Sequence, residues 1–142
     1  MCNQGSIFIF KNIFDKFKKN KASPPEIDSI FSIQEKVIHE LVVNTPNEWE
    51  RIILNFEYFH WDGDYIEKYQ GFAFTPDGKE QIHPSLETFD ELILLNKEMA
   101  KNNPEPWTHC EIELNSLGKY EYNFKYRMPP FTKQMLENIG EI

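Results

Sequence analysis

Two stretches of alternating apolar and polar residues near the C-terminus constrain the fold of this chain most strongly. The alternation runs through residues 106–115 and again through 119–126, with a Ser-Leu-Gly break between them. A period of two residues is typical of a half-buried strand, and a short break containing glycine is typical of a hairpin turn. The pattern therefore predicts two antiparallel strands, near 108–115 and 118–127.

The same alternation assigns the side chains of this hairpin to two sides. One side carries apolar residues, namely Cys110, Ile112, Leu114, Tyr120, Tyr122, Phe124 and Tyr126. The other side carries polar and charged residues, namely His109, Glu111, Glu113, Glu121, Asn123, Lys125 and Arg127. We expect the apolar side to pack against a core and the charged side to face water or a partner.

Similar patterns predict the remaining elements of the main domain. Strands are expected near 49–59, 64–75 and 79–83, with an Asp-Gly turn between the first two. Helices are expected near 26–43, 86–101 and 130–139, the second capped by Ser85. The predicted fold class is α+β, a single domain in which helices cover an antiparallel β-sheet built of hairpins.

The first residues are expected to form an N-terminal amphipathic arm, residues 1–22, ahead of the α+β domain at 23–142. Ile7, Phe10, Phe14 and Phe17 recur at helical spacing among lysines, which predicts a short helix. The run of residues 7–10 alone, Ile-Phe-Ile-Phe, is also a plausible start of a strand.

Composition limits the classes of function. A chain of 142 residues is long enough for one domain with its own core. Its net charge of −8 argues against a nucleic-acid ligand, because phosphate binding needs a basic stripe. Cys2 and Cys110 form no disulfide framework, and the N-terminus does not have the pattern of a secretion signal, so we expect a cytoplasmic location.

Candidate chemistry is sparse. The four histidines have no metal-ligand spacing, and Asp62-Gly63-Asp64 is better explained as hairpin turn chemistry than as part of a calcium loop. Glu111, Glu113 and Glu121 would do acid–base work only in a cleft that shifts their pKa values. We therefore expect no metal, no cofactor and no enzymatic activity, and Cys110 is expected to be a buried thiol.

Several features in a fixed order resemble a known family. They are Asn-Glu-Trp-Glu at 47–50, Gly-Phe-Ala-Phe at 71–74, an acidic helix after Pro84-Ser85, and the hairpin with Pro-Trp-Thr at 106–108. Together they cover residues 47–128 and resemble the YezG-type immunity proteins, antitoxins of bacterial polymorphic toxin systems. The chain departs from that family in residues 1–46 and at Arg127.

The resemblance implies a protein that binds and neutralises the C-terminal domain of a cognate toxin, often a nuclease. An acidic chain suits this role, because a nuclease is cationic in order to attract phosphates. We expect partner contacts at two acidic groups and one aromatic residue, namely Trp61, Asp62, Asp64, Glu67, Glu111, Glu113 and Glu121. Trp61 would be a hot spot if it is exposed, and a core residue otherwise.

Two other functions stay open from the sequence. One is an adaptor module unrelated to toxins that binds proteins through the same acidic sheet face. The other is a small enzyme with a cleft between helix and sheet.

Overall fold

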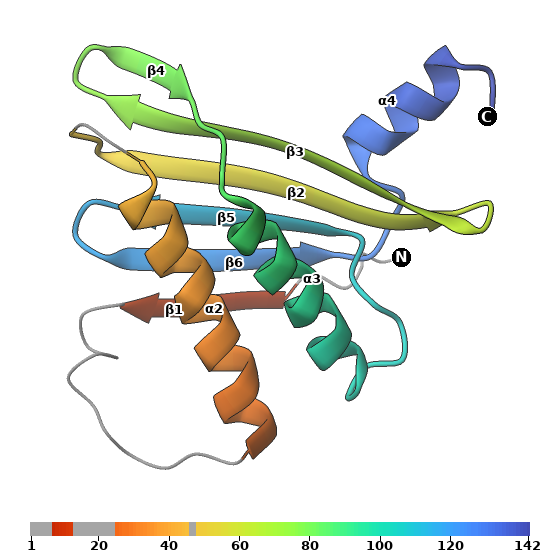
Figure 1. The fold of residues 1–142 in the computed structure, drawn as a ribbon, viewed down its shortest axis with the longest axis horizontal. Coiled ribbons are helices and arrows are strands. Elements are labelled where there is room, and N and C mark those ends of the chain that lie inside the picture. Colours follow the sequence, from red (N-terminus) through yellow and green to blue (C-terminus); the bar gives the residue numbers. More distant parts are fainter. Residues whose placement is uncertain (1–6, 13–24, 46–47) are drawn as a thin grey trace.

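The computed structural model describes residues 7–12, 25–45 and 48–142 (Figure 1). The elements in chain order are β1 (Ile7–Asn12), α2 (Pro25–Val43), β2 (Arg51–Trp61), β3 (Asp64–Thr75), β4 (Gly78–Gln81), α3 (Leu86–Ala100), β5 (His109–Asn115), β6 (Lys119–Lys125) and α4 (Pro130–Asn138). The predicted strands and helices of the main domain are confirmed to within two residues at each end.

The strands form one antiparallel sheet in the order β1-β6-β5-β2-β3-β4. Cys110 lies opposite Phe124, Ile112 opposite Tyr122 and Leu114 opposite Tyr120, so the predicted β5–β6 hairpin and its apolar side are confirmed. The β2–β3 hairpin extends beyond the ends of its neighbours as a two-stranded arm (Figure 1). The α+β fold class is confirmed.

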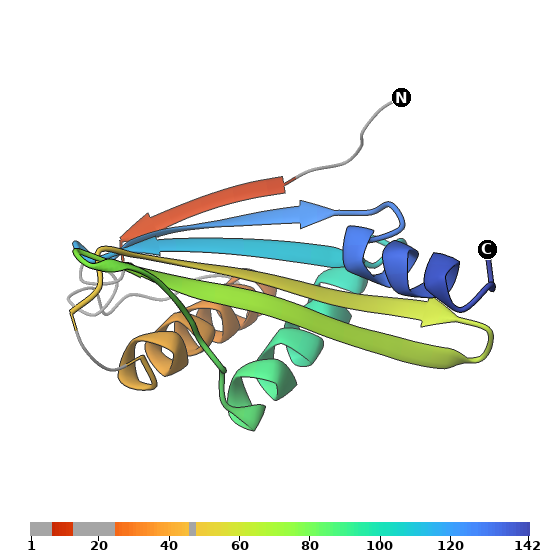
Figure 2. The same cartoon turned by 90° about the horizontal axis from the view of Figure 1, so that it is seen from above.

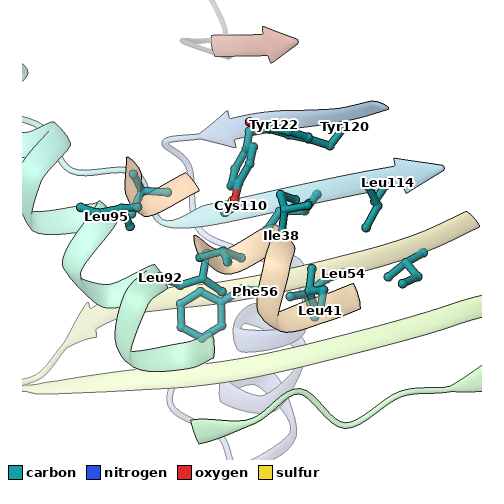
Figure 3. Packing of buried hydrophobic residues seen from close by; sticks show 14 of the residues in the cluster. Ile38, Leu41, Leu54, Phe56, Leu92, Leu95, Cys110, Leu114, Tyr120 and Tyr122 are labelled. Atoms are coloured by element: carbon teal, nitrogen blue, oxygen red, sulfur yellow. The ribbon is translucent and has the colours of Figure 1, made fainter. Parts of the chain in front are cut away.

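Helices α2 and α3 lie together on one side of the sheet (Figure 2). Figure 3 shows Ile38 and Leu41 of α2 and Leu92 of α3 packing over Phe56 of β2. Tyr122 is also fully buried, and its hydroxyl donates a hydrogen bond of 2.7 Å to the carbonyl oxygen of Gln34 in α2. The apolar side of the sheet therefore forms the main core with these two helices.

Helix α3 begins where the sequence predicts. Ser85 has an extended backbone, and its Oγ accepts a hydrogen bond of 3.2 Å from the backbone N–H of Thr88. This interaction satisfies one of the donors that the first turn of a helix leaves free. The predicted N-cap is confirmed.

The other side of the sheet is not entirely open, because α4 packs against part of it (Figure 2). Glu57 points to this side from β2 and is fully buried. Its carboxylate accepts hydrogen bonds from the backbone N–H of Phe131 at 2.8 Å, and from the N–H and hydroxyl of Thr132, both at 2.7 Å. A helix that follows the sheet in sequence therefore folds back over this part of β2. On the polar side of the 109–127 hairpin, the expectation of exposure to water or a partner is wrong at His109, which is 6% exposed.

Glu57 acts as the cap that α4 lacks in its own sequence. Pro129 is at the N-cap position and makes no side-chain hydrogen bond to the helix. A carboxylate at a helix N-terminus satisfies free N–H groups and interacts favourably with the helix dipole. The position of α4 thus depends on a charged residue that lies more than seventy residues earlier in the chain.

The N-terminal segment differs in part from its predicted helix. Residues 7–12 form β1, which pairs antiparallel with β6 from Ile7 opposite Phe124 to Asn12 opposite Lys119. The helix prediction is wrong for these residues, and the alternative of a strand is confirmed. A short isolated helix is only marginally stable in water, whereas a strand that pairs with the edge of a sheet gains hydrogen bonds to a framework that is already formed. Phe14 and Phe17 lie outside the described residues.

None of the helices in the described part of the chain combines the length and the apolar character needed to cross a bilayer.

Replacing Glu57 with alanine should destabilise the fold by about 2–4 kcal/mol, because buried N–H groups of α4 lose a charged acceptor. Urea unfolding of Glu57→Ala measures this change. The matched control is Glu50→Ala, which truncates an exposed glutamate beside the same strand. Its free energy of unfolding should be close to that of the parent. Equal unfolding midpoints for the two variants would contradict the capping role of Glu57.

Candidate interaction surface

The three predicted acids of the second hairpin lie together on the side of the sheet that α2 and α3 leave uncovered. Glu113 of β5 is directly opposite Glu121 of β6, and Glu111 is two residues further along the same side. All three are half-buried. Like charges directly opposite each other in a sheet are destabilising. We call Glu111, Glu113 and Glu121 the acidic face.

Cationic and aromatic residues border the acidic face. Arg51 Nη1 lies 3.2 Å from Glu113 Oε2, and each side chain is 46% exposed. The guanidinium carbon of Arg51 lies 4.6 Å from the centroid of the Phe74 ring. The Nζ atom of Lys79 lies 4.3 Å from the centroid of the Phe72 ring. An exposed ion pair of this kind contributes about 0–1 kcal/mol. Arg51 therefore offsets only part of the charge of the acidic face.

A hollow of about 340 Å³ opens beside the same residues. Among the described residues it is lined by Glu113, Asn115, Lys119, Tyr120 and Glu121. The lining offers carboxylates, an amide and one ammonium group, which suits polar side chains of a partner more than an apolar ligand.

The predicted acids of the first hairpin are at its tip. Asp62 and Gly63 have positive φ angles of 51° and 86°, as a two-residue hairpin turn of the predicted Asp-Gly type requires. Asp62 and Asp64 are exposed. Trp61 is half-buried, its ring stacks 6.2 Å from that of Phe59, and its indole N–H is buried without a hydrogen-bond partner in the described structure. Trp61 is thus neither a fully exposed hot spot nor a fully buried core residue.

Glu67 lies on the opposite side of the sheet from the acidic face. It is paired with Tyr58 in the β2–β3 register, and Tyr58 continues the apolar row of Leu54 and Phe56. The structure therefore separates the predicted contact residues into the acidic face, the hairpin tip and Glu67.

Beside Glu67 the arm carries a row of aromatic rings that the sequence analysis did not assign to a site. The rings of Tyr58 and Tyr65 are stacked, with centroids 4.6 Å apart and planes 8° from parallel. Tyr69 packs 4.8 Å from Phe89 of α3, and its hydroxyl is 3.2 Å from His83 Nδ1. Tyr65 is 59% exposed and Tyr69 40%. We call Tyr58, Tyr65, Glu67 and Tyr69 the tyrosine row.

A signal for the tyrosine row exists in the sequence. Tyr65, Glu67 and Tyr69 alternate with Ile66 and Lys68, so the three must share one side of β3. What the pattern does not show is that α2 and α3 cross other parts of the sheet and do not lie over the arm (Figure 1). That placement leaves aromatic residues of the core side exposed.

His109 is the titratable residue whose environment is most unusual on the polar side. It is 6% exposed, and its Nε2 lies 2.9 Å from Asn55 Oδ1. Burial lowers the pKa of its imidazole to about 4, and the positive charges of Lys125 and Arg127 act in the same direction. His109 is therefore neutral at pH 7.

Other groups with potential chemistry are buried or dispersed. The Cys110 thiol is fully buried, as predicted, and burial raises its pKa well above the ordinary value, so its thiolate is disfavoured. Within residues 7–12, 25–45 and 48–142, no three His, Cys, Asp or Glu side chains gather as a ligand set for a metal ion.

Comparison with known proteins relates the chain to one class, the immunity proteins. No protein-family model matches the chain. Among curated proteins, immunity protein YezG of Bacillus spizizenii is 25% identical over 118 residues, which cover 72% of this chain and 70% of that protein. This similarity supports a distant relationship to immunity proteins.

The lowered pKa of His109 should make the fold sensitive to acid. Between pH 6.5 and about 4 the unfolded chain binds a proton that the folded chain excludes, so stability falls as the pH falls through this window. His109 contributes at most about 1.4 kcal/mol per pH unit to the slope of the free energy of unfolding against pH. Urea unfolding between pH 7 and 4.5 should show a smaller slope for His109→Gln than for the parent.

The exposed histidine of α2 provides the control. His39→Gln removes a histidine from the surface and should retain more of the parent's pH dependence than His109→Gln does. The same pH dependence in His109→Gln and in the parent would contradict the assignment.

Proposed function

We propose that this protein is an immunity protein that binds and neutralises a cognate toxin domain. The observation that carries the proposal is the similarity to a curated immunity protein along 72% of the chain. The toxin domain is, in our proposal, a nuclease, and the protein blocks its active site or substrate groove. Inhibition is stoichiometric and needs no turnover, since inhibitory complexes between proteins reach dissociation constants of about 10⁻¹³ M.

The charge distribution supports a cationic partner. The chain has a net charge of −8. On the acidic face Glu113 lies opposite Glu121, and among the described residues the exposed ion pair with Arg51 offsets only part of their negative charge. A lysine or arginine of the partner would remove the repulsion between them. Nucleases present such side chains because they bind phosphates. Opposite charges also steer the two proteins together and raise the association rate.

The proposed interface draws on the acidic face and on the hairpin tip. Glu111, Glu113 and Glu121 supply negative charge on the open part of the sheet, and Asp62 and Asp64 supply it at the end of the arm. Rim charges mainly change the association rate, whereas charges that become buried and paired change the dissociation rate.

Expression of the toxin domain with and without this protein tests the function. The probe is the C-terminal domain encoded by the gene directly upstream, because immunity genes follow their toxin genes. Cells that express both should grow, cells that express the toxin domain alone should die, and the two proteins should co-purify. Equal killing in both cultures, with no complex, would refute the immunity role. A complex with a neighbour that kills no cells would favour the adaptor module.

The role of the acidic face is tested by reversing its charges. The triple variant Glu111→Lys, Glu113→Lys and Glu121→Lys should associate with the toxin domain about tenfold or more slowly at low salt, and its rate should depend less on salt. Stopped-flow measurements at several salt concentrations give both quantities.

A matched control separates local charge from net charge. The variant Asp77→Lys, Glu80→Lys and Glu105→Lys changes the net charge by the same amount at exposed positions away from the acidic face. If the two triple variants slow association equally, the acidic face has no specific role in binding.

A further inference from the structure

The outer edge of the β2–β3 arm carries no neighbouring strand in the described structure. Strand β3 spans Asp64–Thr75, but β4 pairs only with Phe72–Thr75. Along residues 64–71 the other edge of β3 pairs with β2 without interruption from Trp61 opposite Asp64 to Leu54 opposite Gly71. Because the outward carbonyl of Gly71 is bonded to the N–H of Ile82, the free strand edge of the arm runs over residues 64–70 and is seven residues long.

We propose that this edge binds an extended, lysine- or arginine-bearing segment of the toxin domain, which adds to the sheet as a further strand. The inference rests on the proposed function and adds to the acidic face and the hairpin tip a third contact region, the outer edge of β3. Addition of a strand gives affinity through main-chain hydrogen bonds and specificity through the alternate side chains.

The turn geometry determines which backbone groups are available. In a two-residue hairpin the residues that flank the turn, here Trp61 and Asp64, exchange hydrogen bonds, and every second residue beyond them does the same. Ile66 and Lys68 therefore bond to β2, whereas the N–H and C=O groups of Tyr65, Glu67 and Tyr69 point outward.

The next residue in the outward series confirms this assignment. The carbonyl oxygen of Gly71 accepts a hydrogen bond of 2.9 Å from the N–H of Ile82, which lies on the outer side of β3. The outward groups of Tyr65, Glu67 and Tyr69 continue the same series toward the tip and are available to a partner strand.

The side chains at the same positions suit a cationic segment. Tyr65, Glu67 and Tyr69 are all exposed and lie on one side of the edge. The stack of Tyr65 on Tyr58, and the contacts of Tyr69 with Phe89 and His83, hold the rings in place before binding. Tyrosines anchored in this way are frequent hot spots, and their faces attract lysine and arginine. Glu67 lies between the two rings and supplies the opposite charge.

Charge also argues against a second copy of this chain on the edge. Two copies paired antiparallel about the centre of Tyr65–Tyr69 would place Glu67 opposite Glu67, and like charges directly opposite each other destabilise a sheet. Asp62 and Asp64 at the tip add to the negative charge along the same edge. A cationic strand from a different protein meets no such repulsion.

The edge also lacks most of the features with which proteins prevent unwanted strand pairing. Residues 64–71 contain no proline, and the register with β2 has no bulge. Lys68 is the one lysine in this segment, and it is half-buried on the other side of the strand. Exposed edges are normally protected by prolines, bulges or exposed lysines. An unprotected edge is expected where a partner strand binds.

Residue-resolved amide hydrogen exchange tests the proposal on the full chain, alone and bound to the catalytically inactivated toxin domain from the upstream gene. In the free protein, the outward amides of Tyr65, Glu67 and Tyr69 should exchange rapidly, while those of Ile66 and Lys68 are protected. In the complex the outward amides should slow by about tenfold or more. The inward amides are an internal control and should be protected in both states.

Two substitutions test the chemistry of the partner segment. Glu67→Lys and Tyr65→Ala should each weaken binding of the toxin domain by about tenfold or more. Their matched controls are Glu80→Lys, on the exposed edge strand β4, and Leu86→Ala, at an exposed apolar position of α3, which should bind as the parent does.

The outcomes separate this inference from the proposed function. If the toxin domain is bound and neutralised but the outward amides still exchange rapidly, docking on the edge is refuted and the immunity role stands. If the amides are protected but Glu67→Lys binds as tightly as the parent, the partner segment is not cationic. Absence of any complex or neutralisation refutes both proposals.

Discussion

Burial of one side of a twisted antiparallel sheet under two helices is the interaction on which the rest of this structure depends. Ile38 and Leu41 of α2 and Leu92 and Leu95 of α3 are 0–2% exposed. Below them lie fully buried residues of β2, β5 and β6 (Figure 3). Hydrophobic burial of this kind is the main favourable term in folding, and it is non-directional. Directional interactions such as the bond from Tyr122 to Gln34 then define how α2 sits on the sheet.

A second, smaller contact closes part of the opposite side. There the central residue is a carboxylate, since Glu57 accepts three hydrogen bonds from the start of α4. A buried charge without such partners would be costly. With its three hydrogen bonds, the Glu57 carboxylate positions α4 over the base of the β2–β3 arm. The polar side of the sheet is thereby divided into a part that α4 covers and the acidic face.

The two candidate contact regions follow from where these coverings end. The acidic face lies on β5 and β6 and is partly exposed, whereas α4 packs against β2 and β3 (Figure 2). The tyrosine row is exposed because the β2–β3 hairpin continues past α2 and α3 (Figure 1). Both regions are built on strands, and strands hold binding groups in more definite positions than loops do.

Local patterns in the sequence determined the elements of the main domain and the sides of its strands. Alternation placed Cys110, Ile112 and Leu114 on the core side, Asp62-Gly63 indicated the hairpin turn, and Ser85 marked the start of α3. These features depend on residues close together in the chain, so a single sequence contains them.

Only the tertiary structure decided which element lies against which. The same local rules did not place α4 over Glu57, did not pair residues 7–12 with β6, and did not separate Glu67 from the acidic face. Each of these outcomes depends on contacts between residues distant in sequence, and periodicity describes one element without its neighbours. The alternation of Tyr65, Glu67 and Tyr69 was present in the sequence, but their exposure depends on which part of the sheet two helices elsewhere in the chain cover.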